Sequence, residues 1–192
     1  DDGSVVQWGD VCSCESGNDV CDAKVRLRPS AVALDCKVKR VYAGACSNFA
    51  IDAAGRAYAW GLNNYGQLGV EAVARPPNDG QFVYPAKRVI SNFEGGRVVK
   101  VAPATQHSLF VTSQGRVFSC GNMHYGRLGI KDVKDHVFVP TEVSESTSVL
   151  SSRLKPRFVD VAAGQMHSLA LTYQGEAYAW GCGDDYQLGS GT

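Results

Sequence analysis

Apolar residues recur in short alternating runs at three places along the chain, and these places are sixty residues apart. In the third place, Phe158 to Ala162 is a short apolar run, while His167 to Thr172 and Ala177 to Trp180 alternate between apolar and polar positions. Alternation with a period of two is typical of β-strands that have one buried face. The pattern therefore predicts an all-β chain in which each place holds a set of antiparallel strands.

A glycine punctuates the interval between the second and third strand of each copy, at Gly55, Gly115 and Gly175. A glycine one place before the returning strand supplies the positive φ that a short hairpin loop with a bulge requires. A further extended segment precedes the second and third copies, around Phe82 to Val89 and Val137 to Val143. About four strands per repeat, stacked at a constant interval, predict the blades of a β-propeller.

The repeated segments run from Val41 to Gly69, from Val101 to Gly129 and from Val161 to Gly189. Trp60 and Trp180, like Trp8 near the start of the chain, end strands at equivalent positions, so we expect their indoles to pack in the core. The residues that we expect to maintain the repeat are Gly55, Trp60, Gly61, Gly115, Gly121, Gly175, Trp180 and Gly181.

The start of the chain reads as a broken copy, because Gly3, Trp8 and Gly9 have the same internal spacing as their counterparts in the first full copy. We expect the chain to open inside a blade, and we expect the blade that ends near Gly189 to lack its outer strand. A closed propeller has at least about four blades, so an incomplete ring of about three blades plus a partial blade is predicted. We divide this single partial propeller, residues 1–192, into a degenerate partial blade (1–40), two repeats (41–100 and 101–160) and a truncated repeat (161–192).

Composition and motifs argue against several classes of function. Lysine and arginine number 19, as do aspartate and glutamate, so no overall field draws the chain to nucleic acid or acidic lipid. No apolar run approaches the length of a membrane span, no phosphate-binding glycine motif follows a strand, and no catalytic triad is recognisable. We predict no catalytic residue, no cofactor, no small-molecule substrate and no membrane contact.

His107 and His167 share one repeat position, so we expect each of them to form a hydrogen bond with a backbone group within its own blade.

The chain has seven cysteines, and neither their odd number nor their spacing is that of a disulfide framework. Unpaired thiols favour a reducing compartment such as the nucleus or the cytoplasm. Cys46, Cys120 and Cys182 lie inside the repeats, where we expect small buried apolar residues. The cluster from Cys12 to Cys36 lacks paired C-x2-C knuckles. We therefore predict no metal, and a metal or redox role for this cluster remains a minor alternative.

In the loops that follow the third strand of each copy, the flanking residues recur from copy to copy while the polar side chains differ. They comprise residues 62–66, 122–126 and 182–186. In a propeller these loops leave equivalent strand ends and gather on one face. Variable loops on a repeated frame are expected where a scaffold presents an asymmetric surface to a partner, although they can also be merely polar loops. The candidate partner-binding residues are Asp10, Asn63, Asn64, Tyr65, His124, Tyr125, Asp184 and Asp185.

The segment Trp60-Gly61-x-Asn63-x-x-Gly66-Gln67-Leu68-Gly69, preceded by Ala43-Gly44, resembles the repeat of the regulator of chromosome condensation family. Members of that family fold as a seven-bladed β-propeller. The order of the three loops is similar to the later repeats of the family's chromatin-bound exchange factor, which would make this chain the C-terminal half of such a propeller.

The resemblance implies that one propeller face binds a small GTPase of the Ran type, or another protein, and that no cofactor is needed. In the founding member of the family this binding distorts the nucleotide pocket of the GTPase and accelerates the release of GDP, whereas many relatives keep the propeller and lack exchange activity. It further implies a nuclear protein, with chromatin contacted through parts outside this chain. By position, the residues that would carry the exchange are Asp10, the loop from Leu62 to Gly66, His124, Asp184 and Asp185.

One residue departs from the family's exchange factor. That factor offers a histidine between the tyrosine and glutamine of the first loop, whereas this chain has Gly66 there. Glycine cannot make the contact of a histidine side chain. The departure favours the alternative hypothesis, a propeller scaffold that mediates protein–protein interactions in a larger assembly and has no exchange activity.

Overall fold

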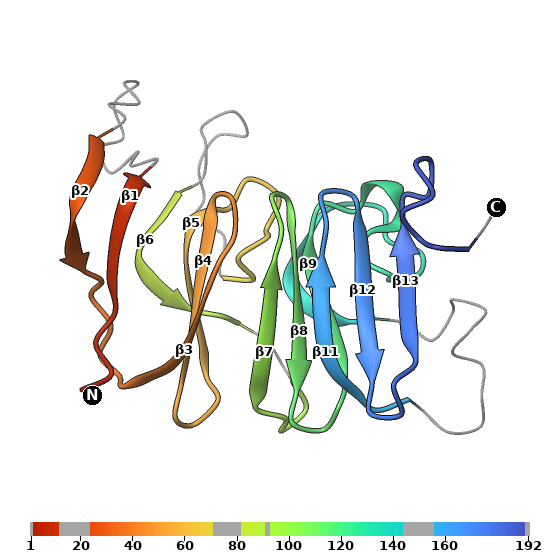
Figure 1. Ribbon diagram of the computed structural model, residues 1–192, viewed down its shortest axis with the longest axis horizontal. Helices are drawn as coiled ribbons and strands as arrows, with labels where there is room; N and C mark the ends of the chain where they lie inside the picture. The colour runs from red at the N-terminus through yellow and green to blue at the C-terminus, as the bar shows by residue number, and fades with distance from the viewer. Residues whose placement is uncertain (1, 12–23, 71–81, 91–92, 144–155, 191–192) are drawn as a thin grey trace.

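The computed structural model describes residues 2–11, 24–70, 82–90, 93–143 and 156–190 (Figure 1). In this part of the chain the regular structure consists of antiparallel strands and one short 3-10 helix, η1 (His124–Gly126). None of the described helices is long and apolar enough to span a bilayer. The all-β prediction is therefore confirmed.

The strands form four sheets that follow one another in chain order across the molecule (Figure 1). The first sheet pairs β1 (Val6–Val11) with β2 (Lys24–Ala31). The second consists of β3 (Val38–Ala43), β4 (Ser47–Asp52), β5 (Ala57–Leu62) and β6 (Phe82–Arg88). The third consists of β7 (Val98–Pro103), β8 (His107–Thr112), β9 (Val117–Gly121) and β10 (Val137–Glu142). The fourth consists of β11 (Phe158–Ala163), β12 (His167–Thr172) and β13 (Ala177–Gly181).

Within each sheet the strands are neighbours in the order in which they occur along the chain. The extended segments that separate the copies, β6 and β10, pair with the copy before them, as the register of Gly61 with Val83 in the second sheet illustrates. A blade therefore consists of one copy and the extended segment that follows it. The first strand of each blade lies against the preceding sheet, β7 against β3 and β4, and β11 against β7 and β8. This arrangement is the incomplete propeller ring that the repeat predicts.

The glycine turns join each sheet to the next one. Gly55, Gly115 and Gly175 have φ values of 77°, 77° and 89°, as the hairpin prediction requires. The carbonyl of Gly55 also accepts a hydrogen bond from the N–H of Val98 at 2.9 Å, and Gly115 accepts one from Phe158 at 2.9 Å. The turns at Gly55 and Gly115 consequently hold the first residue of the following sheet, so the local hairpin and the stacking of these blades depend on the same glycine.

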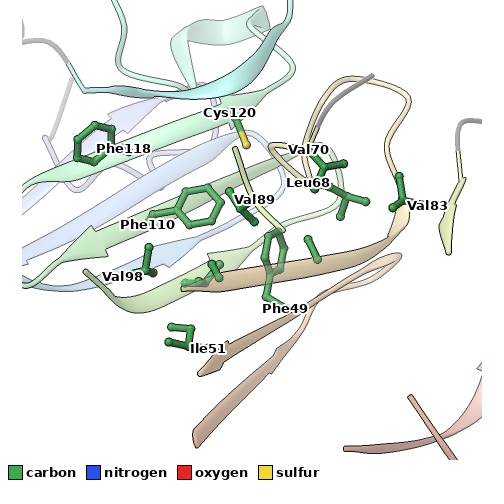
Figure 2. Close-up of a cluster of buried hydrophobic side chains, with 13 residues drawn as sticks. Phe49, Ile51, Leu68, Val70, Val83, Val89, Val98, Phe110, Phe118 and Cys120 are labelled. Atoms are coloured by element: carbon green, nitrogen blue, oxygen red, sulfur yellow. The ribbon is translucent and has the colours of Figure 1, made fainter. Parts of the chain in front are cut away.

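Apolar side chains fill the space between successive sheets. Between the second and third sheets, Phe49 on β4 meets Phe110 on β8 edge to face, with ring centres 5.6 Å apart (Figure 2). Phe93 adds a second perpendicular contact, to Phe118 at 5.1 Å. Strand β8 is buried along its whole length because both of its faces are covered by neighbouring sheets. Removal of these side chains from water is the main stabilising contribution, about 1.5–3 kcal/mol for each fully buried large apolar side chain.

The tryptophans face the sheet that precedes their own. Trp60 and Trp180 are buried, and their indole N–H groups donate to the Gln7 side chain at 2.9 Å and to the Arg127 carbonyl at 3.0 Å. Trp8 is 64% exposed, which contradicts our expectation of core packing for this residue. The physical reason is that Trp8 lies in the first sheet of the chain, so no preceding sheet among these residues covers its indole.

Cys120 takes the position that tryptophan has in the other copies, and its buried thiol contacts the Gln67 carbonyl at 3.5 Å. Burial raises the pKa of Cys120. Cys46 and Cys182 are only half-buried, so the expectation of buried cysteines holds fully for Cys120 alone among the three.

His107 connects two sheets rather than groups within one blade, which corrects our expectation for this position. Its ring is fully buried, and Nε2 lies 2.9 Å from the Ser168 hydroxyl on β12 of the next sheet. The Ser168 hydroxyl in turn donates to the Arg127 carbonyl at 2.8 Å. Burial above all, assisted by the nearby charges of Arg127 and His167, lowers the pKa of His107 to about 3. The imidazole is therefore neutral at physiological pH.

We expect Trp180→Ala to destabilise the protein by about 3–5 kcal/mol, because it leaves a cavity between the third and fourth sheets. Trp180→Phe keeps most of the volume and loses the indole hydrogen bond, so a smaller loss is expected. Urea unfolding of the full-length protein measures both values. Tyr173→Ala is the control, since that side chain is 76% exposed and its loss should change stability by less than about 0.5 kcal/mol. A loss below about 1 kcal/mol for Trp180→Ala would contradict the core assignment.

The low pKa of His107 predicts a pH dependence of stability. Between pH 6.5 and about 3 the unfolded state binds a proton at this imidazole and the folded state does not. Stability should therefore be complete above pH 6.5 and fall as pH decreases, with a limiting slope of about 1.4 kcal/mol per pH unit from this group. Urea unfolding at pH 7 and pH 5 should show a larger loss for the wild type than for His107→Gln. An equal loss in the two proteins would mean that His107 is not responsible.

Candidate functional site

The loops that follow β5, β9 and β13 lie at the same end of their sheets, at the top of the view in Figure 1. In each loop the N–H of the closing glycine donates to the carbonyl three residues earlier, at 3.0 Å. The described parts of these loops are residues 63–70, 122–136 and 182–190, and we call them together the loop face. The prediction that the loops gather on one face is confirmed.

Only some of the contact residues that we predicted in the first loop are accessible at its surface. Asn63, which we predicted as a contact residue, is buried, and its Oδ1 accepts a hydrogen bond from the N–H of Leu68 at 3.0 Å. A short amide side chain that accepts a hydrogen bond from a backbone N–H of its own loop stabilises the turn. Asn63 therefore shapes the loop from inside and is corrected from a contact residue to a structural one. Asn64 is exposed and Tyr65 is half-buried, so both remain candidates.

Gly66 is required by the packing of this loop on β10. Its φ is +80°, and a Cβ at this position would lie 2.7 Å from the Cα of Phe138. Any larger residue would have to displace the backbone of β10 as well as adopt a left-handed conformation. The absence of a histidine at this position is thus built into the packing of the second sheet against the third.

Aromatic rings join the first loop to the second. Tyr65 and His136 are perpendicular with ring centres 5.0 Å apart, and His136 and His124 follow at 5.7 Å. His124 is exposed, and its Nδ1 lies 2.7 Å from Oδ1 of Asn122, so this nitrogen carries a proton. His136 was not predicted from the sequence. It lies outside the repeated segment, immediately before β10, so no repeat signal marks it.

Arg127 is the most deeply buried charged residue beneath the loop face, with 2% of its surface exposed. Its Nε donates to the His124 carbonyl at 2.9 Å, and Nη1 donates to Oε1 of Gln106 and to the Gln165 carbonyl, both at 3.1 Å. Its guanidinium also lies 5.5 Å from the centre of the Tyr125 ring. Burial lowers the pKa of Arg127, and no described carboxylate forms an ion pair with it.

Arg127 therefore holds the second loop in place from below. Its side chain ties together the loops before β8 and β12, while its carbonyl accepts the hydrogen bonds of Ser168 and Trp180 from the fourth sheet. The sequence contained a usable signal for this residue, because the equivalent positions hold Gln67 and Gln187. A change from amide to guanidinium in one copy is the kind of difference that marks a specialised position.

The third loop carries exposed acidic groups. Asp184 and Asp185 are both exposed, and the N–H of Asp185 donates to Oε1 of Gln187 at 2.8 Å. No described cation forms an ion pair with either carboxylate. The second and third loops are adjacent, because η1 lies against β13. The structure therefore places Tyr125 and His124 beside the loop that contains the aspartates.

Two further sequence predictions lie at or beyond the limits of the described residues. Asp10 is on β1, opposite Val25 and one residue before the strand ends. Its side chain is outside the described part of the structure. Cys12, Cys14 and Cys21 are also outside it, so the metal alternative for the cysteine cluster is not tested.

We expect Arg127→Ala to destabilise the protein by about 1–3 kcal/mol, because it removes the donors of buried carbonyls. Arg127→Gln is the matched variant. In the first copy, the amide of Gln67 reaches the Thr105 carbonyl, which corresponds to the Gln165 carbonyl used by Arg127. The glutamine variant should therefore lose clearly less stability in urea unfolding. Equal losses for the two variants would mean that the hydrogen bonds of Arg127 do not support the loop.

The Regulator of chromosome condensation (RCC1) repeat matches residues 54–111 and 114–171 of this chain. A second description of the same repeat matches residues 38–67 and 158–187. Together these matches cover residues 38–111 and 114–187, which extend from β3 to β13.

Similar proteins agree with the repeat. The Regulator of chromosome condensation of Homo sapiens is 34% identical over 153 residues, which are 78% of this chain and 32% of that protein. Guanine nucleotide exchange factor SRM1 of Saccharomyces cerevisiae is 30% identical over 198 residues, which cover 100% of this chain and 40% of that protein. The chain thus spans about a third to two-fifths of the length of these curated relatives.

A solved structure extends the similarity to the fold. The crystal structure of Kap60 bound to yeast RCC1 (Prp20) matches with a TM-score of 0.74 and 28% identity, over 97% of this chain and 41% of the matched chain. The four consecutive sheets and their repeated loops are thus those of an RCC1 propeller. On the repeat, the relatives and the fold together, the chain belongs to the RCC1 repeat family of β-propellers.

Proposed function

We propose that the protein containing this chain is a guanine nucleotide exchange factor for a small GTPase of the Ran type, and that the loop face is part of its binding surface. The observation that carries the proposal is the similarity to Guanine nucleotide exchange factor SRM1 over the whole of this chain. The geometry supports it, because the loops present different polar groups from one rigid frame.

Exchange of this kind needs binding and no covalent step. A factor that binds the nucleotide-free GTPase more tightly than the GDP complex must, by reciprocity, weaken the binding of GDP. Each tenfold preference corresponds to about 1.4 kcal/mol of coupling. The chain contributes a surface held by buried hydrogen bonds, since Arg127 in the second loop bonds to Gln106 before β8, to Gln165 before β12 and to the hydroxyl of Ser168. Neither a cofactor nor a catalytic residue is part of this proposal.

The exposed carboxylates of Asp184 and Asp185 give the third loop a negative charge that is not neutralised by a described ion pair. Such groups contribute mainly to the rate and the specificity of association, because opposite charges on a partner are attracted at a distance.

As a corollary of the same proposal, we place the protein in the nucleus, with chromatin contacted through parts outside this chain.

A second candidate function is an interaction scaffold without exchange activity. One observation favours it: the packing of Gly66 against Phe138 leaves no room for a side chain at this position of the first loop. Under this alternative the loop face binds another protein, and the protein does not accelerate the release of GDP from a GTPase.

The test is the release of fluorescent GDP from Ran in the presence of the full-length protein. We expect acceleration, and we expect Asp184→Asn with Asp185→Asn to reduce the rate at least about tenfold while stability changes by less than about 0.5 kcal/mol. The control is Glu176→Gln, which removes an exposed carboxylate from the turn at the opposite end of the fourth sheet. No acceleration by the wild-type protein would leave the scaffold function, and equal rates for all variants would exclude these two aspartates from the site.

A further inference from the structure

A hollow of about 200 Å³ lies between the second and third sheets, at the end opposite the loop face. Residues of the turns after β4 and β8, which are at the bottom of the view in Figure 1, form part of its lining. Both sheets that border it consist of four strands, so it lies within the described part of the ring and not at its edge. The polar residues of its lining are Lys39, Arg40, Asp52, Arg97 and Ser113.

The positive charge of this hollow is not offset by a carboxylate. Lys39, Arg40 and Arg97 are exposed, and they form no ion pair among the described residues. The side chain of Asp52 is buried and bound within its own turn. Its Oδ1 accepts two backbone hydrogen bonds, at 2.8 and 2.9 Å, and its Oδ2 accepts one from the side chain of Arg56. The three cations therefore have no acidic partner in the lining.

The junction of the third and fourth sheets has a different arrangement at the equivalent positions. Lys100, sixty residues after Arg40, forms an ion pair with Asp160 on β11. Val99, sixty residues after Lys39, packs against the apolar cluster between these sheets. An apolar residue in place of Lys39 would therefore fit the repeat, whereas clustered charges of one sign destabilise a fold by mutual repulsion. Folding alone gives no reason for Lys39.

We propose that the hollow is a binding site for a phosphate group, either as the free ion or attached to a protein side chain. Arginine presents a planar fork that pairs with two phosphate oxygens, and lysine adds a compact positive charge. A phosphate monoester has about 1.5 to 2 negative charges at pH 7, so three cations can neutralise it. The site lies at the end of the blades opposite the loop face and does not depend on the proposed exchange function.

Two donors of the hollow are held in place by the fold. Nη1 of Arg40 donates to the Val99 carbonyl, which lines the hollow, so the other donors of the guanidinium stay available. The hydroxyl of Ser113 accepts a hydrogen bond from the N–H of Arg97 at 3.2 Å, and no described group accepts its own proton. This proton can therefore be donated to a phosphate oxygen. Side chains that are already ordered lose less conformational freedom on binding.

The size and the charge of the hollow favour a small anion. Its volume is below the roughly 300–1,000 Å³ of pockets that bury a drug-sized ligand. Binding of nucleic acid depends on many phosphate contacts along an extended basic surface. The net charge of this chain is zero, and the three cations are concentrated at one junction. A single phosphate group is therefore the better fit.

The decisive variant is Lys39→Val in the full-length protein, because valine is the residue of the other two copies at this position. Melting temperatures are measured in sodium phosphate and in sodium chloride of equal ionic strength, so that screening is the same. Phosphate should raise the melting temperature of the wild type above its value in chloride, since a ligand of the folded state stabilises it. In chloride, Lys39→Val should melt at the wild-type temperature or higher. Its dissociation constant for phosphate should be at least about tenfold weaker, as for the loss of one charged hydrogen bond.

Lys87→Val is the matched control. Lys87 is exposed on β6, the outer strand of the second sheet, and it is not part of the lining. The control removes the same charge and should keep the full effect of phosphate. N-acetyl-phosphoserine amide, with N-acetylserine amide as its uncharged counterpart, identifies the source of the phosphate group. Tighter binding of the phosphoserine compound than of inorganic phosphate supports a phosphorylated protein partner, and equal affinity supports the free ion.

Several results would overturn the inference. If the wild type melts at the same temperature in phosphate and in chloride, or if Lys39→Val keeps the full effect of phosphate, the hollow is not a phosphate site. If Lys39→Val melts at a lower temperature than the wild type in chloride, Lys39 has a structural role. If a DNA duplex binds through Lys39 while neither phosphate probe binds, the cations belong to a nucleic-acid surface. None of these measurements involves Ran, so their outcome is independent of the exchange function.

Discussion

Every part of this structure depends on one sheet covering the apolar face of the next. A four-stranded antiparallel sheet with apolar residues on both faces cannot stay exposed in water, and the contact of Phe49 with Phe110 is one of many that hide those faces. The contrast between Trp180, which is buried against the preceding sheet, and Trp8, before which no sheet is described, illustrates the constraint. Whether a tryptophan of the repeat is buried therefore depends on the neighbouring sheet and not on the residue type alone.

The same constraint explains the polar groups that lie between the sheets. Most buried polar groups form hydrogen bonds, and at the junction of the third and fourth sheets His107 Nε2, the Ser168 hydroxyl and the Arg127 carbonyl form a chain of them. This chain lies directly beneath the loop face. Hydrogen bonds therefore link the second loop to buried groups between the third and fourth sheets, and these groups support the proposed binding surface from below.

Much of this arrangement was predictable because it follows from local patterns. The strands, the hairpin glycines and the common face of the loops all follow from a period of two and a repeat of sixty residues. The candidate residues Asn64, Tyr65, His124, Tyr125, Asp184 and Asp185 lie on that face. Asn63 has the same polar character and is buried, because its amide bonds to its own loop. His136 was not predicted, since it lies outside the repeat.

The sequence by itself determined the family, the blade pattern and the positions of the loops, since these depend on spacing along the chain. The tertiary structure alone decided which side chains are exposed, which sheet covers each tryptophan, and why Gly66 cannot be replaced by a larger residue. It also decided that Tyr186 has a positive φ of 58°, like Gly66 and Gly126 at the equivalent positions of the other two loops. The physical reason is that burial and backbone strain are set by contacts between residues far apart in sequence, and a linear pattern does not contain those contacts.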